Sequence, residues 1–306
     1  MRDSGDLLIG SIGTTDYDEI VYELDGETVT TDVSPAALVE LCDIGQALIF
    51  RTPEAGEKND HRLREAFSAT NVDFELIDIG LIEKQEDVNK ILQRIVDTTR
   101  SSRFREDSII LDISHSFRSI PIVFLLSVMQ LTSLYENAAL KKIYYSRFAG
   151  SSDHESSPVI DMTYLRTMIE WYDAFEMAGQ NGTYREIRVL LEERKEEIWT
   201  DNESHPEGQN FSKAVGQFGA AQQAIDAGFP LEAGLKANVT LESISGLDEE
   251  AFVGPEGMVL NSLERLLNGF DTDQDVSDKS ELTLDEKELR RQANIVQYYV
   301  DNERYW

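Results

Sequence analysis

Short apolar runs alternate with more polar segments through the first half of the chain. The runs have the length and the β-branched content of buried strands, and 84–100 repeats apolar residues at helical spacing. The predicted strands are 7–12, 47–52, 73–80, 108–113 and 140–148, and the predicted helices between them are 58–68, 84–100 and 117–136. This alternation predicts a mostly parallel sheet with helices on both faces, an α/β fold.

A hairpin is predicted close to the N-terminus. EIVYEL (19–24) and ETVTTDV (27–33) flank Asp25-Gly26, a dipeptide typical of tight hairpin turns. Ser34-Pro35 then predicts the start of a helix, with Ser34 as the N-cap and Pro35 in the first turn. PVIDM (158–162) predicts one further strand.

The pattern changes after residue 163. TYLRTMIEWYDAFEMAG and YREIRVLLEERKEEIW have a helical rhythm, and polar, turn-rich segments separate the helices that follow. The expected organisation is therefore an α/β domain over 1–162 and an all-helical domain over 163–306.

The chain is strongly acidic. It has 58 Asp and Glu against 28 Lys and Arg, and its formal net charge is −30. An acidic surface poor in lysine stays hydrated in strong salt, where charge repulsion is screened, so we expect a salt-loving source. The alternative is an acidic protein of no special habitat. Under either reading the net charge argues against loose binding to bulk DNA or RNA, which depends on neutralising phosphates, but it leaves room for a local site for a small anion.

The cysteine content and the hydropathy of the sequence bear on where in the cell the protein resides. Cys42 is the only cysteine, so an intrachain disulfide is excluded. MRDSGDLLIG at the N-terminus lacks the apolar core of a signal peptide, and the stretch IPIVFLLSVMQLTSLY (120–135) is short for a membrane span. We expect a cytoplasmic protein without a membrane partner.

Two predicted loops contain the candidate ligand-binding residues. GSIGTT (10–15) follows the first predicted strand, and SHSFR (114–118) follows the strand that ends at Asp112. Ligands of open parallel sheets bind beyond the carboxyl ends of the strands, where N–H groups, hydroxyls and a helix N-terminus form an anion site. Arg118 would add a forked cation. The candidate ligand-binding residues are Ser11, Gly13, Thr14, Thr15, Ser114, His115, Ser116, Phe117 and Arg118.

Structural roles are an alternative for three of these residues. Ser116 would then cap a helix, Arg118 would pair with Asp112 or a surface acid, and His115 would be a half-buried, hydrogen-bonded histidine. The chain contains neither the G-x-G-x-x-G order of dinucleotide sites nor a P-loop, which argues against a dehydrogenase. No metal site and no cofactor are predicted.

Three segments resemble the CRISPR-associated Rossmann-fold (CARF) family. They are LLIGSIGTTDYDEIVYELDGE (7–27), LDISHSFRSIP (111–121) and PVIDMTYLRTMIEWYDAFEMAG (158–179). The second is similar to the family motif D-x-T-H-G-F-R-S-x-P, with Ser114 in place of Thr and Ser116 in place of Gly. The resemblance covers about residues 7–185. It implies a Rossmann-like ligand-binding domain followed by a helical HEPN-like effector or dimerisation domain.

The resemblance also implies a function. Such proteins bind cyclic oligoadenylates made by type III CRISPR complexes in antiviral defence, as homodimers with the ligand across the two-fold axis. Cyclic tetra-adenylate is the ligand expected here. Its phosphates would meet Ser11, Thr14, Ser114 and Arg118, and His115 would lie in or beside the pocket.

The helical part of such proteins usually carries a ribonuclease motif, an Arg followed four to six residues later by His. Only Arg147…His154 has this spacing, and it lies outside the helical domain. The chain looks shortened after NERYW, so RNA is an expected partner only where a complete HEPN domain is supplied. Three hypotheses stay open: a sensor, a ring nuclease that cleaves the ligand in the CARF pocket, and a regulatory partner of a full-length HEPN ribonuclease. Whether the chain is an enzyme is therefore undecided.

Overall fold

A computed structural model describes residues 5–70, 72–101, 107–115, 119–135, 138–146, 156–201, 208–226, 230–245 and 247. The chain divides into two compact units, Met1–Thr163 and Tyr164–Trp306. The first is an α/β unit and the second is helical, and each is considered by itself.

The α/β unit follows the predicted order of elements. Its strands are β1 (Asp6–Ser11), β2 (Ile20–Leu24), β3 (Glu27–Thr31), β4 (Ile44–Arg51), β5 (Asp73–Asp78), β6 (Asp107–Asp112), β7 (Ala138–Ser146) and β8 (Ser157–Asp161). Its helices are α1 (Ser34–Leu41), α2 (Pro53–Ser68), α3 (Gln85–Ser101) and α4 (Ile120–Leu134). The largest difference is α2, which begins at Pro53 rather than at residue 58 because Thr52 caps it by accepting from the N–H of Ala55.

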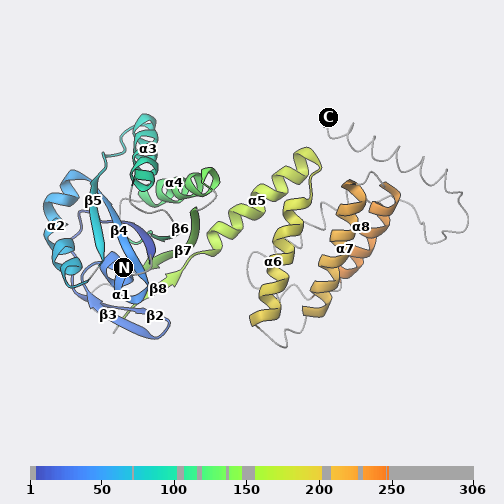
Figure 1. Ribbon diagram of the computed structural model, residues 1–306, viewed down its shortest axis with the longest axis horizontal. Helices are drawn as coiled ribbons and strands as arrows, with labels where there is room; N and C mark the ends of the chain where they lie inside the picture. The colour runs from blue at the N-terminus through green and yellow to red at the C-terminus, as the bar shows by residue number, and fades with distance from the viewer. Residues whose placement is uncertain are drawn as a thin grey trace, which may run out of the picture. The chain divides into compact units, whose positions relative to one another are not determined.

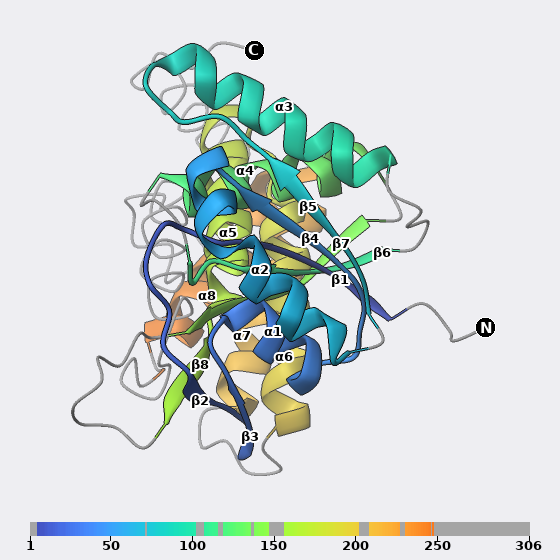
Figure 2. The ribbon, with the colours of Figure 1, turned by 90° about the vertical axis from the view of Figure 1, so that its left-hand side faces the viewer.

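The described strands form one sheet in the order β3-β2-β8-β7-β6-β1-β4-β5. Its pairings are parallel except β2–β3 and β7–β8, which are antiparallel. Figures 1 and 2 show the helices layered on the sheet. Neighbouring residues of a strand face opposite sides: Ile49 packs with α1 and α2, whereas Phe50 meets Phe124 of α4. The predicted Rossmann-like, mostly parallel sheet is confirmed.

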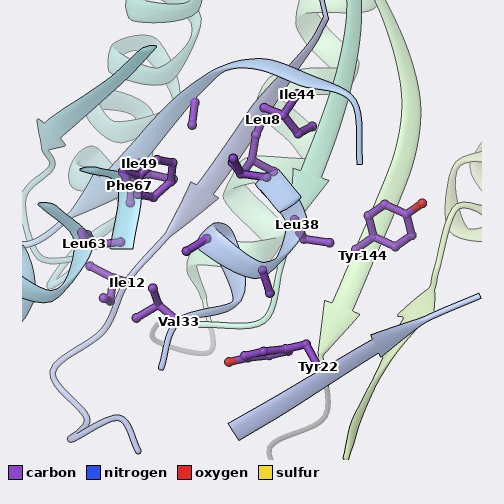
Figure 3. Close-up of a cluster of buried hydrophobic side chains, with 14 of the residues drawn as sticks. Leu8, Ile12, Tyr22, Val33, Leu38, Ile44, Ile49, Leu63, Phe67 and Tyr144 are labelled. Atoms are coloured by element: carbon purple, nitrogen blue, oxygen red, sulfur yellow. The ribbon is translucent and has the colours of Figure 1, made fainter. Parts of the chain in front are cut away.

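One apolar cluster joins α1 and α2 to the sheet (Figure 3). Leu8 of β1, Leu38 of α1 and Leu63 of α2 are fully buried in it. Burying a side chain of this size stabilises the fold by about 1.5–3 kcal/mol. This cluster holds α1 and the C-terminal half of α2 against the central strands, and it includes Ile12 at the start of the first candidate loop.

The hairpin between β2 and β3 has the predicted turn. Asp25 and Gly26 have φ angles of 51° and 85°, the left-handed region that a two-residue turn of this kind requires. Tyr22 of β2, which precedes this turn, is buried in the apolar cluster.

The prediction that Ser34 caps α1 is wrong. The N-cap is Val33, and no side chain caps this end of the helix. Ser34 is instead the first helical residue, with Pro35 beside it, and its hydroxyl donates to Asp112 at the end of β6. The hydroxyl thereby supplies one of the donors that a buried carboxylate needs.

The second unit is helical throughout its described residues, as predicted. It contains α5 (Tyr164–Asn181), α6 (Arg185–Asp201), α7 (Gly208–Asp226) and α8 (Pro230–Ser245), around a core that includes Trp171, Ile187, Leu191, Phe211 and Phe218. The predicted helical domain extends to residue 306, and residues 248–306 lie outside the described part of the chain. Within the described part of the chain, no helix is long and apolar enough to cross a membrane.

Candidate functional site

The two candidate loops leave neighbouring parallel strands. β1 ends at Ser11 and β6 ends at Asp112, and Leu7–Ile9 pair with Ile109–Leu111. From β1 the sheet extends through β4 to β5 on one side, and the chain then returns to β6 on the other. This is a topological switch point, the place where open α/β sheets form their ligand crevices. The loops at 12–19 and 113–119 therefore begin at adjacent strand ends.

Ser11 ties the two loops together. Its side chain is buried, and its hydroxyl donates a 2.5 Å hydrogen bond to the carbonyl oxygen of His115. Beyond it, the N–H of Gly13 donates to the hydroxyl of Tyr17 at 2.9 Å. Thr14 is half-buried and Thr15 is exposed. Within this loop, Ser11 and Gly13 serve the protein's own structure, and the two threonines lie nearer to solvent.

Asp112 is the centre of the second loop. Its carboxylate is fully buried and accepts from the Ser34 hydroxyl at 2.5 Å, from the Ser114 N–H at 2.9 Å and from the Ser114 hydroxyl at 2.5 Å. Ser114 in turn accepts from the N–H of Ser146 at the end of β7, at 2.8 Å. A buried carboxylate needs several donors to offset its lost hydration, and this turn supplies them.

His115 is buried rather than open to solvent. Its Nε2 atom lies 3.2 Å from the N–H of Ser34 and 3.4 Å from the hydroxyl of Tyr22. The Tyr17 ring meets the imidazole edge-on, with centroids 4.6 Å apart. Because a backbone N–H can only donate, Nε2 must be the unprotonated nitrogen, and the proton sits on Nδ1. Burial lowers the pKa of His115, with Asp112 and Asp32 acting in the opposite direction, so the ring is neutral near pH 7.

Helix α2 binds the loop that follows β1 through two side chains. Asn59 of α2 is fully buried and donates through Nδ2 to the carbonyl oxygens of Gly13 at 2.9 Å and Thr15 at 3.1 Å. One turn later, Arg62 donates to the carbonyl oxygen of Tyr17 at 2.7 Å and to Asp32 at 3.1 Å. The loop after β1 is therefore held by α2 on one side and by its own Tyr17 on the other.

The structure brings together five of the nine predicted site residues at the ends of β1 and β6: Ser11, Gly13, Thr14, Ser114 and His115, with Thr15 beside them on the surface. Ser116, Phe117 and Arg118 lie outside the described residues. His115 is buried and hydrogen-bonded within the protein, as the alternative of a structural histidine predicts. Its contact with a ligand, like those of Ser11 and Ser114, stays a prediction.

Four residues of this network were not predicted from the sequence: Tyr17, Tyr22, Ser34 and Asn59. A signal existed for Asn59, because it occupies the spacing of a buried helix face between Ala55 and Leu63, where an apolar residue is expected. Tyr17 and Tyr22 fall within the stretch that resembles the CARF start, but His115, the ring that both contact, is distant in sequence.

Among the described residues, no group of three His, Cys, Asp or Glu side chains is arranged to hold a metal ion. Arg147 and His154, which have the spacing of the ribonuclease motif, and His205, the one histidine in residues 163–306 of the sequence, all lie outside the described residues.

Comparison with known proteins gives one partial similarity. The chain is 33% identical over 91 residues to the CRISPR-associated protein MJ1674 of Methanocaldococcus jannaschii. The match covers 29% of this chain and 14% of that protein, so the chain aligns with about one seventh of its relative. No family model matches the chain.

Proposed function

We propose that this chain is a CRISPR-associated sensor that binds cyclic oligoadenylate, with cyclic tetra-adenylate as its ligand, in type III antiviral defence. One observation carries the proposal: the CARF-like segment LDISHSFRSIP leaves β6 beside the loop of β1, at the switch point of a Rossmann-like sheet. The partial similarity to a CRISPR-associated protein supports it.

The chemistry of the two loops suits an anionic ligand. They offer the hydroxyls of Thr14 and Thr15 and the guanidinium of Arg118. Between residues 112 and 121 the sequence has one permanent cation, Arg118, and one acid, Asp112, whose carboxylate is already engaged inside the protein. Asp16, beside the two threonines, pairs with Lys58 at 3.0 Å, and a paired acid repels an anion less on a chain of net charge −30.

The proposed assembly is a homodimer through α4. Ile122 and Leu126 lie one helical turn apart and are 63% and 50% exposed in the single chain. Exposed aliphatic side chains at this spacing form a stripe suited to a second helix, and the helix follows directly on the candidate loop. A two-fold axis beside α4 would let both subunits offer the same loops to one cyclic ligand.

A sensor is favoured over a ring nuclease by the state of two hydroxyls. Ring cleavage needs groups held against the ribose 2′-hydroxyl and the scissile phosphate. Ser11 donates to the His115 carbonyl, and Ser114 is bonded to Asp112 and to the N–H of Ser146. These hydroxyls are occupied within the protein. Ring cleavage, and regulation of a full-length HEPN ribonuclease, remain the competing functions.

Calorimetric titration in molar KCl tests the proposal, with cyclic tetra-adenylate, cyclic hexa-adenylate and linear tetra-adenylate as ligands. We expect saturable binding of the cyclic tetramer, and chromatography of the bound nucleotide should return it intact. Binding of none of the three would overturn the proposal, and steady conversion to linear product would favour the ring nuclease.

A pair of isosteric variants locates the site. Thr14→Val removes a hydroxyl from the candidate loop, and Thr28→Val makes the same change on the exposed edge strand β3. We expect Thr14→Val to weaken binding by roughly tenfold, because a lost hydrogen bond to a charged group has about that effect, and Thr28→Val to leave it unchanged. Equal effects would place the ligand elsewhere.

A further inference from the structure

The hydrogen bonds of Asn59 set the direction of two peptide groups in the loop after β1. Its Nδ2 atom donates to the carbonyl oxygens of Gly13 and Thr15, so both carbonyls point toward α2. The described peptide bonds are all trans. In a trans peptide, the C=O of one residue and the N–H of the next point in opposite directions. The N–H groups of Thr14 and Asp16 therefore point away from α2.

These two N–H groups differ from that of Gly13 in their partners. The Gly13 N–H donates to the Tyr17 hydroxyl at 2.9 Å. Within the described part of the chain, no residue accepts from the N–H of Thr14 or of Asp16. Two neighbouring N–H groups that face one way without an internal acceptor form a small anion-binding surface.

The same helix holds the rest of this loop. Arg62 binds the carbonyl oxygen of Tyr17 at 2.7 Å, and Lys58 pairs with the Asp16 carboxylate at 3.0 Å. The Lys58 contact draws the negative charge of Asp16 toward a cation, which lessens its repulsion of an incoming anion. Three side chains of α2, those of Lys58, Asn59 and Arg62, thus hold the segment 13–17 before any ligand arrives.

Asn59 does not stabilise the folded state as well as an apolar residue would at this buried position. It is fully buried, and its Oδ1 atom has no hydrogen-bond partner among the described residues. A buried polar atom without a partner destabilises the folded state and calls for another explanation. The two donors that Asn59 supplies to the loop provide one, because Ala or Leu at this position would pack without the unpaired oxygen and would leave the loop unbound.

We infer that Asn59 is a positioning residue of the ligand site: it orients the N–H groups of Thr14 and Asp16 so that both donate to one phosphate of the ligand. This inference rests on the proposed function and assigns part of it to a residue of α2 that lies outside both candidate loops. Preorganised donors bind more tightly because the loop loses less freedom when the ligand docks.

The test compares Asn59→Ala with Leu63→Ala. Leu63 lies one turn further along α2, is fully buried and has no hydrogen bond to the loop, so its truncation lowers stability without releasing the loop. Affinity for cyclic tetra-adenylate is measured by titration well below the melting temperature of each variant. We expect Asn59→Ala to weaken binding roughly tenfold and Leu63→Ala to change it less than about twofold.

A second readout reports on the two N–H groups directly. In the ¹⁵N-labelled wild-type protein, the amide protons of Thr14 and Asp16 should move downfield on addition of cyclic tetra-adenylate, and in Asn59→Ala both movements should shrink. Equal losses of affinity in the two variants, or Thr14 and Asp16 signals that ignore the ligand while it binds the wild type, would overturn the inference and leave the proposed function intact. A wild-type protein that binds no cyclic oligoadenylate would overturn both.

Discussion

The hydroxyl of Ser34, the first residue of α1, donates a 2.5 Å hydrogen bond to the carboxylate of Asp112, the last residue of β6. The two residues are 78 positions apart, and both are fully buried. The bond ties the start of a helix to the end of a central strand, directly below the candidate loops. Ser114 binds the same carboxylate, so one buried acid organises three segments.

Replacing Asp112 should destabilise the protein markedly. In Asp112→Ala, the Ser34 hydroxyl and both donors of Ser114 lose their acceptor, and each buried unpaired group costs about 1–3 kcal/mol. We expect the free energy of unfolding to fall by at least about 2 kcal/mol, measured by urea denaturation in molar KCl. Ser127→Ala is the control, since that buried hydroxyl bonds only to the Val123 carbonyl of its own helix. Equal losses in the two variants would contradict the role given to Asp112.

The state of His115 predicts a dependence of stability on pH. Burial lowers its pKa in the folded protein below the ordinary value of 6.5, against the opposing charges of Asp112 and Asp32, while Tyr17 and Tyr22 also face the ring. The unfolded chain therefore binds a proton as pH falls through about 6.5, and the folded protein does so only at lower pH. The contribution of His115 to stability is complete above that pH and is lost as pH falls, by up to about 1.4 kcal/mol per pH unit.

Denaturant titrations between pH 7 and pH 5 on two variants isolate this effect. His115→Phe should reduce the fall in stability with decreasing pH, because the titrating group is gone. His61→Gln removes an exposed histidine of α2 and should retain the full wild-type slope. The assignment fails where both variants have the slope of the wild type.

Arg118→Ala should weaken binding of cyclic tetra-adenylate. Arg118 lies outside the described residues, and its alternative partner, Asp112, already accepts from Ser34 and Ser114. Charge-assisted hydrogen bonds to a phosphate contribute roughly 1.5–3 kcal/mol each, so we expect a loss of about one to two orders of magnitude in affinity. Calorimetry measures the affinity, and melting of the free protein is the control. A lowered melting temperature with unchanged affinity would assign Arg118 to the structure instead.

The proposed homodimer should dissociate when a charge enters the exposed face of α4. Leu126→Lys places an ammonium group at the proposed interface, and burying an unpaired charge there is strongly unfavourable. Leu81→Lys is a matched control, because Leu81 is 48% exposed against 50% for Leu126 and lies outside α4. In molar KCl, light scattering at micromolar concentration should find dimers for the wild type and Leu81→Lys and monomers for Leu126→Lys. A monomeric wild type would refute the dimer.

The chain should not cut single-stranded RNA, with or without cyclic tetra-adenylate. The spacing of Arg and His typical of the HEPN motif is absent from residues 163–306 of the sequence. A fluorogenic RNA substrate measures cleavage. Ligand-stimulated cleavage would contradict this prediction. If it persisted in a His154→Ala, His205→Ala double variant, the protein would contain a nuclease centre without this motif.

Local patterns in the sequence determined the elements of this protein and their order. Buried parallel strands have a sequence of continuous apolar residues, which identifies them. The Asp25-Gly26 dipeptide identifies the hairpin turn because few residues tolerate positive φ. The position of the candidate loops was also predictable, since each polar segment follows such a run and ligands gather at strand ends. These features depend on neighbours within a few residues along the chain.

Partners distant in the chain decided the roles of single side chains. Ser34 has the local setting of a helix cap, but tertiary packing places a buried carboxylate beside it, and Asp112 takes the bond. His115 reads as a ligand contact beside Ser114, yet the hairpin and α1 enclose it with Tyr22 and the Ser34 N–H. Asn59 reaches the loop after β1 from a helix more than forty residues later. Hydrogen-bond partners follow from which surfaces the fold buries together, and that arises only when the whole sheet is assembled.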